Sequence, residues 1–469
     1  ALKPLAANID SNIHWENRSY IKLGYGNFTT PYAQAAFSFG DGAKSIVNVK
    51  GLYTSSKSSV PFQQFSKTEL DAIGLFASPG NKNEWNGKLF YKNSTQYQYG
   101  FLPDSLKFSK DELRQGFTTF GGTVGVRNKT ENTAGINYHP NVSLSLFRDD
   151  DGSNESNFKI EAPMVKSFGK IFGFGLGLTA DITTYKSDSA GEITNNLYYV
   201  TPAILFKTPN FNITGGFSPS WDNQVFSMLP NFSAEAKINE EKFILLAGWM
   251  GYFNKTTYQS LASVNPWLQQ PKFLLNTKIQ EQYAGFKGSA GAHVTYNAKV
   301  SYLKFNNQPL FINDTVTGKS FRVINESEMK AVRIHGEIGY TLQEKLSLLA
   351  GATFNQYSSL KNNEKAWGLV PLEVNAALRW QVLKDFLVKT DVFFWDGAQY
   401  PNKLMQVRKL DPALDVNAGV EFSIMPQLNA WVQFNNIFNN KYQRWNQYPV
   451  FGFNVMAGVV FNFGELKTK

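Results

Sequence analysis

The sequence predicts an all-β fold, a single antiparallel β-barrel of about 22 strands that spans a membrane. Three observations lead to this prediction. Apolar and polar residues alternate with period two along many stretches, and short and long connections alternate along the chain. Phe, Tyr and Trp make up 15% of the residues, yet the mean hydropathy is only −0.30. Many strands that each have one apolar face account for this composition.

The last strand-like stretch, 452–463, shows the alternation clearly. Its apolar face carries Phe453, Val455, Ala457, Val459, Phe461 and Phe463, and its opposite face carries Asn454, Met456, Gly458, Val460 and Asn462. A barrel closes by pairing its last strand with its first. We therefore expect 452–463 to pair with 19–28, where Ile21, Leu23 and Tyr25 continue a lipid-facing band, while Asn454, Gly458 and Asn462 face the lumen.

The other strands follow from the same period-two pattern, bounded by turn residues. In order, the predicted strands are 19–28, 33–40, 45–57, 68–77, 84–101, 117–128, 133–147, 155–165, 172–185, 195–207, 210–220, 231–238, 242–254, 280–290, 292–305, 329–342, 346–358, 370–383, 385–395, 413–425, 427–435 and 452–463. Several of the polar faces carry full charges, which suit water and not a packed protein interior.

The connections set the orientation of the barrel. Those after even-numbered strands are short, such as 41–44 and 169–171, whereas several after odd-numbered strands are long and polar, such as 102–116, 255–279 and 306–328. This asymmetry is typical of transmembrane barrels, with the short turns on the periplasmic side. We expect periplasmic termini: a segment 1–18, the barrel 19–464 and a tail 465–469.

Composition excludes several classes of protein. The longest apolar run, 243–253, is far shorter than the roughly 20 residues of a spanning helix. Cysteine is absent, which excludes disulfides and thiolate chemistry and fits bacterial envelope proteins. The start of the chain shows no signal peptide, so we expect a mature chain. The net charge of +9 is scattered, which argues against nucleic acid and leaves membrane lipids as the expected anionic partner.

A six-residue segment recurs at the entry to two descending strands of neighbouring hairpins. Phe65-Ser66-Lys67-Thr68-Glu69-Leu70 is followed by Phe108-Ser109-Lys110-Asp111-Glu112-Leu113. The Ser-x-x-Glu spacing is that of a capping box, which opens a short helix. The alternative is that two neighbouring hairpins have similar turns.

The region before the last strand resembles the C-terminal end of the TonB-dependent outer-membrane receptors. Residues 435–442, Asn-Asn-Ile-Phe-Asn-Asn-Lys-Tyr, match the segment that leaves the penultimate strand of those receptors, and Tyr448-Pro449-Val450-Phe451-Gly452 matches the turn into the last one. The resemblance implies a 22-stranded barrel in a bacterial outer membrane. The Asn-rich, Tyr-rich composition and the Asn-Phe-Gly ending also resemble proteins of the Bacteroidota.

The sequence departs from these receptors at its N-terminal end. Such receptors carry an N-terminal plug domain of well over a hundred residues, whereas fewer than twenty residues precede the first predicted strand. We therefore expect the resemblance to cover the barrel without the plug, and active import driven by TonB is not implied.

No catalytic, metal or cofactor site is predicted, and we expect no enzyme. The four histidines, His14, His139, His293 and His335, are far apart and lack metal-ligand spacing. The turn 149–154, Asp-Asp-Asp-Gly-Ser-Asn, has the oxygen density of a calcium loop, but it lacks the EF-hand pattern and is better explained as a surface turn.

Two groups of residues remain as functional candidates. Charged polar faces either brace a hydrated interior or line a selective channel, and the lumen-lining candidates are Arg333, His335, Glu337, Glu373, Arg379, Lys389 and Asp391. The loop 258–278 is apolar for a water-facing segment, and its contact candidates are Trp267, Leu268 and Phe273. Such a loop folds into the lumen, binds a partner or packs against a neighbouring loop.

Two functions follow from this reading. The first is a structural or accessory subunit of an outer-membrane complex in secretion, surface export or outer-membrane biogenesis, with other envelope proteins as partners. The alternative is a passive or partner-gated solute channel or transporter of the outer membrane. A barrel of about 22 strands encloses an opening wide enough to breach the membrane, so in both cases something must occupy it.

Overall fold

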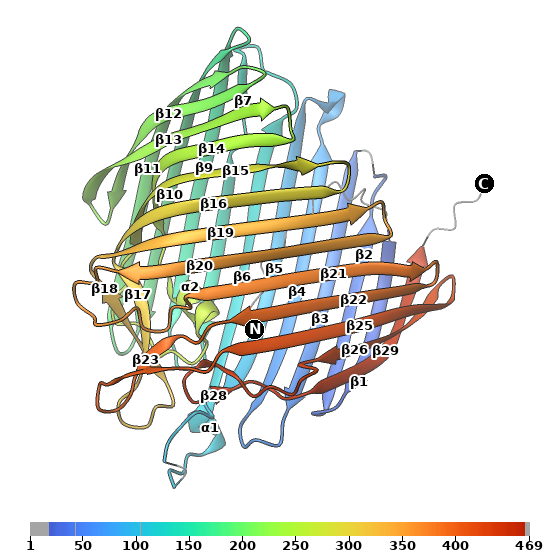
Figure 1. The fold of residues 1–469 in the computed structure, drawn as a ribbon, viewed down its shortest axis with the longest axis vertical. Coiled ribbons are helices and arrows are strands. Elements are labelled where there is room, and N and C mark those ends of the chain that lie inside the picture. Colours follow the sequence, from blue (N-terminus) through green and yellow to red (C-terminus); the bar gives the residue numbers. More distant parts are fainter. Residues whose placement is uncertain (1–17, 43, 104, 465–469) are drawn as a thin grey trace.

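A computed structural model describes residues 18–42, 44–103 and 105–464. It shows a closed antiparallel barrel, which Figure 1 presents from one side. The main sheet has 23 strands, of which β7 (Ile136–Tyr138) and β8 (Asn141–Asp149) both pair with β9 in one continuous register. They are two parts of one strand position, which leaves 22 positions around the wall, as the sequence predicts.

The other strands of the wall succeed one another in chain order. They are β1 (Arg18–Gly26), β2 (Thr30–Phe39), β3 (Ser45–Lys57), β4 (Gln64–Ala77), β5 (Asn83–Tyr97), β6 (Arg114–Asn128), β9 (Asn154–Phe168), β10 (Phe172–Ser187), β11 (Gly191–Lys207), β12 (Phe211–Asp222), β13 (Val225–Asn239), β14 (Phe243–Asn254), β15 (Thr277–Ala290), β16 (Val294–Asn306), β19 (Met329–Leu342), β20 (Leu346–Ser358), β21 (Leu372–Leu383), β22 (Phe386–Trp395), β25 (Ala413–Met425), β26 (Leu428–Asn435) and β29 (Asn454–Gly464).

Smaller elements occur in the connections. Among the described residues there are three two-stranded hairpins: β17 (Gln308–Asn313) with β18 (Phe321–Glu326), β23 (Gln399–Pro401) with β24 (Val407–Lys409), and β27 (Gln443–Trp445) with β28 (Tyr448–Pro449). In the described part of the chain, the helices are the 3₁₀ turn η1 (Pro79–Asn81), α1 (Lys110–Leu113) and α2 (Tyr258–Val264). The hairpins and α1 gather at one end of the barrel, at the lower left of Figure 1. By the predicted orientation this is the extracellular end.

The barrel closes at the predicted seam. Ile21 pairs with Phe461, Leu23 with Val459 and Tyr25 with Ala457 in the antiparallel β1–β29 ladder. Leu23, Tyr25, Val459 and Phe461 are each at least 40% exposed, so this face points away from the protein. Closure removes the sheet edges, which would otherwise present unpaired backbone groups to lipid.

The two faces of the wall differ in chemistry. Large apolar side chains are exposed on the outward face of strand after strand, for example Leu89 at 60%, Phe120 at 52% and Ile338 at 53%. Such a surface suits the hydrocarbon of a bilayer. The inward face carries most of the charged pairs, such as Lys299–Glu281 at 2.9 Å. Among the described residues, no helix is long and apolar enough to cross a membrane.

The structure corrects some sequence predictions. The strand predicted at 133–147 is interrupted, because Pro140 has no N–H to donate to the ladder. The repeated segment has two different outcomes. Ser109 and Glu112 form the capping box of α1, whereas Ser66 and Glu69 lie within strand β4. The predicted N-terminal segment, apart from Arg18, and the tail 465–469 lie outside the described residues.

Candidate functional site

All seven lumen-lining candidates lie on the inward face of the wall. In β19, Val332, Ile334 and Ile338 are exposed on the outer face, so the alternate residues Arg333, His335 and Glu337 point inward. The paired registers carry this face from β19 through β20 to β21 and β22. There it holds Glu373, Arg379, Lys389 and Asp391.

These candidates spread along the wall and do not converge on one site. Arg333 donates from Nε to Oδ1 of Asn355 at 2.7 Å, and His335 Nδ1 lies 2.9 Å from Thr353 Oγ1. Lys389 forms a long ion pair with Glu421 at 3.6 Å. Each contact joins adjacent strands and so cross-links the inner face of the wall.

The connection 255–276 crosses the lumen. It joins β14 to β15, yet its middle contacts β5 and β6, and six strands, β8 to β13, separate β6 from β14 along the wall. The Trp267 indole N–H donates to the carbonyl oxygen of Tyr97 at 3.1 Å, and Gln115 donates to the carbonyl oxygen of Leu268 at 3.0 Å. A segment that contacts distant parts of the wall in this way obstructs the mouth.

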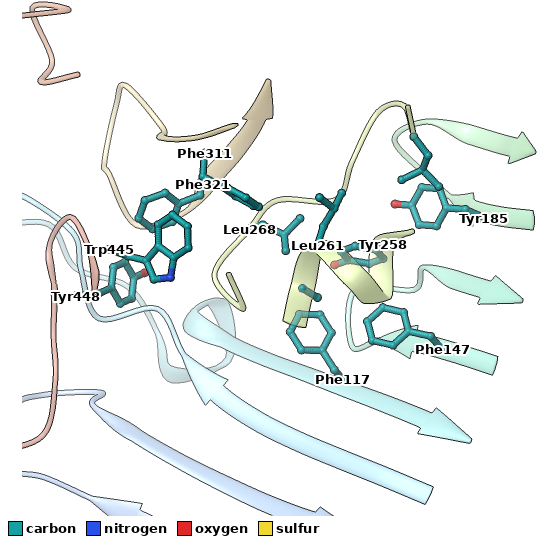
Figure 2. Packing of buried hydrophobic residues seen from close by; sticks show 12 residues of the cluster. Phe117, Phe147, Tyr185, Tyr258, Leu261, Leu268, Phe311, Phe321, Trp445 and Tyr448 are labelled. Carbon is teal, nitrogen blue, oxygen red and sulfur yellow. The ribbon is translucent and has the colours of Figure 1, made fainter. Parts of the chain in front are cut away.

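Helix α2 anchors this connection to the inner wall. The ring of Tyr258 packs among Phe117, Phe147 and Tyr185, with ring centroids 5.2 to 6.1 Å apart (Figure 2). Its hydroxyl donates to Oδ2 of Asp149 at 2.8 Å. Buried aromatic rings with a satisfied polar tip favour one fixed position, and they hold α2 against β6, β8 and β10.

A carboxylate from β9 contacts the start of α2. Glu155 is buried and accepts hydrogen bonds from the backbone N–H groups of Tyr258 and Gln259. The first N–H groups of a helix have no partner within the helix, so the carboxylate satisfies them and favours the helix terminus electrostatically. Thr257 and Ser260 form a capping box at the same terminus.

Both stems of the connection are fixed by a buried polar network. Asn195 and Asn276 are fully buried and exchange hydrogen bonds of 2.7 and 2.9 Å between their side-chain amides. The Asn276 amide also accepts from the Thr256 N–H at 2.9 Å and donates to Asp222 at 2.7 Å. Buried polar groups that are mutually satisfied specify one arrangement.

Two hairpins from other parts of the rim meet the connection. Trp267 stacks on Tyr448, and Tyr448 in turn contacts Phe321 of β18, with centroids 5.8 Å apart. Figure 2 shows Phe311, Phe321, Trp445 and Tyr448 on one side of Leu268 and the α2 residues on the other. We refer to the segments 255–276, 308–326 and 443–449 as the cap. Buried side chains from all three segments, among them Leu268, Phe321 and Tyr448, form one cluster with residues of the inner wall.

Burial shifts the pKa of two groups in the loops. Desolvation lowers the pKa of the Arg444 guanidinium to about 10, although Glu373 opposes this shift. Desolvation also raises the pKa of Tyr99 to about 12, and Tyr99 donates to the carbonyl oxygen of Pro449 at 2.9 Å. Both groups therefore keep their usual protonation at neutral pH, Arg444 charged and Tyr99 neutral.

The three contact candidates of the connection have different environments. Leu268 is fully buried in the cap and Trp267 is partly buried against Tyr99 and Tyr448, whereas Phe273 is 47% exposed. The sequence allows this apolar loop to fold into the lumen, to bind a partner or to pack against a neighbouring loop. In the structure, Trp267 and Leu268 are folded inward. Phe273 presents an apolar surface that no described residue covers fully.

The turn 149–154 is occupied by protein contacts. Asp149 accepts from Ser153 N–H at 2.7 Å as well as from Tyr258, and Asp150 pairs with Arg114 at 2.8 Å. Among the described residues, no group of three or more His, Asp or Glu side chains is arranged to hold a metal ion.

Sequence reasoning missed the polar residues that hold the cap. The sequence indicates Asp149 only as part of a turn, and it does not distinguish Glu155, Asn195, Tyr258 and Asn276 from other polar or aromatic residues. The Thr257-x-x-Ser260 spacing could have indicated the start of α2. No local pattern could have indicated the Asn195–Asn276 pair, because its members are 81 residues apart.

Comparisons with known proteins identify the fold. No protein-family model and no curated protein matches the chain. Solved structures do match: a mutant of the ferric enterobactin receptor PfeA from Pseudomonas aeruginosa has a TM-score of 0.70 at 9% identity, covering 95% of this chain and 80% of that one. The siderophore receptor PiuA from Acinetobacter baumannii gives 0.70 at 10% identity, with 95% and 82% covered.

A third match is the FrpB iron transporter from Neisseria meningitidis, with a TM-score of 0.72 at 11% identity, covering 95% of this chain and 81% of that one. At such low identity the likeness concerns the fold alone, and the binding properties in these names belong to those proteins. The fold implies an outer-membrane location. The chain thus has the 22-stranded outer-membrane barrel fold of the TonB-dependent siderophore receptors.

Proposed function

We propose that this barrel is a non-enzymatic, structural or accessory subunit of an outer-membrane complex. In this proposal the cap obstructs the mouth, and the outermost loops bind another envelope protein. Secretion, surface export and outer-membrane biogenesis are settings in which such a subunit would work.

The observation that carries the proposal is an exposed apolar apex built from three connections. Leu102 is 45% exposed, Val316 76%, Leu404 77% and Met405 58%. The Lys403 ammonium holds these connections together, because it donates to the carbonyl oxygens of Leu102 at 3.2 Å and Val316 at 3.1 Å. Large apolar side chains that gather on a water-facing surface are typical of protein interaction sites.

The experiment that tests this function is isolation of the native protein in a mild detergent, followed by identification of its stoichiometric companions. The variant Leu404→Asp/Met405→Asp is expected to lose the companion, and the control Leu404→Met/Met405→Leu is expected to keep it. A native chain that purifies alone, or a companion that the Asp variant retains in full, would contradict the proposal.

A partner-gated channel is the second candidate, and the charged inner wall favours it. Arg333, Glu373 and Lys389 lie on the inward face beneath the cap, where water and ions could pass if the cap moved. Recording in planar bilayers tests this function. The absence of any conductance, both with the cap intact and with its contacts removed, would exclude it.

A further inference from the structure

The outer wall of the barrel contains a pocket of about 570 Å³ near its extracellular end. The pocket extends over β5, β6, β8, β9 and β10. Most of its lining residues share the outward face with the exposed Phe158 and Ile182: Tyr91, Thr118, Phe120, Leu146, Arg148, Asn154, Ser156, Thr184 and Lys186. The pocket therefore opens toward the membrane and not toward the lumen.

The lining residues form two rows. The row nearer the extracellular end has Thr118 paired with Arg148 and Asn154 paired with Lys186. The row beneath it, about 7 Å lower along the strands, has Phe120 paired with Leu146, and beside them the small residues Ser156 and Thr184. The small side chains leave room between the aromatic and aliphatic groups, which accounts for the hollow.

Positive charge borders the pocket. Among the described residues, Arg148 makes no ion pair or side-chain hydrogen bond, and its side chain is exposed. Lys186 pairs with Glu192 at 2.7 Å, but both side chains are more than half exposed. An exposed ion pair of this kind contributes at most about 1 kcal/mol, so Lys186 can exchange partners readily. The nearby carboxylate of Asp150 is already paired with Arg114.

The lower row adds hydroxyl groups. Within the described part of the chain, the side chains of Ser156 and Thr184 have no protein hydrogen-bond partner, although they face outward. A hydroxyl in contact with hydrocarbon alone would lose its hydrogen bonds. These groups therefore fit the headgroup region, while Phe120 and Leu146 fit acyl chains.

We propose that this pocket binds the phosphate-bearing headgroup of an anionic lipid in the outer leaflet. Arg148 and Lys186 contact the phosphate, the hydroxyls of Ser156 and Thr184 contact neighbouring oxygen atoms, and an acyl chain lies along Leu146 and Leu144. The two cations complement the charge of a phosphate, and they lie above an apolar stripe that an acyl chain can contact. A lipid matches both features, whereas a soluble anion matches only the first.

Native mass spectrometry of the detergent-solubilised full chain, titrated with diphosphoryl lipid A, tests the proposal. Two cationic contacts of about 1 kcal/mol each imply that Arg148→Gln/Lys186→Gln weakens binding roughly thirtyfold. Ser156→Leu/Thr184→Leu, which fills the hollow with groups that lipid tolerates, should also abolish specific binding. Heat-modifiable gel migration shows whether each variant has a folded barrel.

The matched control is Lys278→Gln/Lys330→Gln. These lysines also face outward near the extracellular ends of β15 and β19, since their neighbours Ile279 and Ala331 are buried inside, but they do not line this pocket. The control should bind lipid A as the native chain does. Equal losses in the control and the Arg148 variant, or no loss in either, would overturn the proposal. Competition by inorganic phosphate at matched concentration would assign the site to a free anion instead.

Discussion

The indole of Trp267 stacks on the phenol ring of Tyr448, with 4.0 Å between the ring centroids and 28° between the ring planes. Trp267 belongs to the connection between β14 and β15, and Tyr448 to the hairpin before the closing strand. Tyr99 packs edge-on against both rings, at 5.8 and 4.8 Å. This aromatic triad joins three connections from different parts of the rim, and it is therefore a central contact of the cap.

Removing this triad should loosen the cap. Trp267→Ala and Tyr448→Ala each delete an aromatic pair worth about 0.5–1.5 kcal/mol beyond its buried area. We expect more frequent or larger channel openings in planar bilayers than for the native chain, and an effect of the double variant smaller than the sum of the single effects. Trp221→Ala, which removes an exposed indole outside the cap, serves as the control. Conductance that no cap variant changes would contradict a gating role.

The hydroxyl of Tyr258 should contribute separately from its ring. Tyr258→Phe keeps the packing but removes the donor to Asp149, whose buried carboxylate then loses one hydrogen bond. The expected cost is about 1–3 kcal/mol, because the lost bond was made to a buried charged group. Hydrogen exchange of 255–276 should accelerate, whereas Tyr25→Phe on the exposed outer face should leave it unchanged. Equal protection in both variants would show that packing alone holds α2.

The strands of the wall could be predicted from the sequence because the pattern that indicates them lies within each short segment of the chain. A strand that separates lipid from water must alternate, so the period of two at 329–342 and 452–463 indicated both the strands and their inward residues. The seam followed from closure alone. The predicted bounds of an individual strand were wrong where one residue interrupts the ladder, as Pro140 does between β7 and β8.

The cap could not be predicted because its contacts are long-range and aperiodic. Trp267 meets Tyr97 across 170 residues and Asn195 meets Asn276 across 81. The apolar character of 258–278 indicated that the loop needs cover, but the same character fits a partner, the lumen or a neighbouring loop. Only the three-dimensional arrangement distinguishes these possibilities.

Acid should release the connection 359–371 from the β17–β18 hairpin. Glu326 is fully buried, and desolvation by itself would raise its pKa. Its carboxylate accepts hydrogen bonds from the Asn363 side chain and from the backbone N–H groups of Asn362 and Lys361. These hydrogen bonds outweigh the desolvation, so the pKa of Glu326 is lowered. Because the pKa of Glu326 in the folded protein lies below the ordinary value of 4.5, the ionised carboxylate stabilises the contact at pH values above 4.5. This stabilisation is lost as the pH falls through the lowered pKa. Hydrogen exchange of 359–371 should therefore accelerate in acid.

Glu326→Gln should remove most of this acid dependence. The neutral amide accepts weaker hydrogen bonds at every pH, and we expect a loss of about 1–3 kcal/mol in local stability at neutral pH. Glu240→Gln, in an exposed turn, is the matched control and should retain the acid response of 359–371. An unchanged pH dependence in Glu326→Gln would assign the response to another group.

The seam should depend on two glycines beneath one indole. Gly24 pairs with Gly458 across the β1–β29 ladder, and Trp431 lies over this pair, buried, with its indole N–H donating to the carbonyl oxygen of Leu23 at 3.2 Å. A Cβ on Gly24 would lie 2.3 Å from the Trp431 ring. Gly24→Ala must therefore displace the indole, and overpacking of this kind costs about 1–3 kcal/mol.

A double variant distinguishes displacement of Trp431 from a general loss of strand pairing. Trp431→Ala alone should cost about 3–5 kcal/mol through the cavity that it leaves. If the clash is the cause, adding Gly24→Ala to Trp431→Ala should cost little more, as urea unfolding in detergent would measure. Gly87→Ala, whose nearest neighbouring atom lies at 4.0 Å, is the control and should have little effect. Additive losses in the double variant would mean that Gly24 is required by the ladder itself and not by the indole.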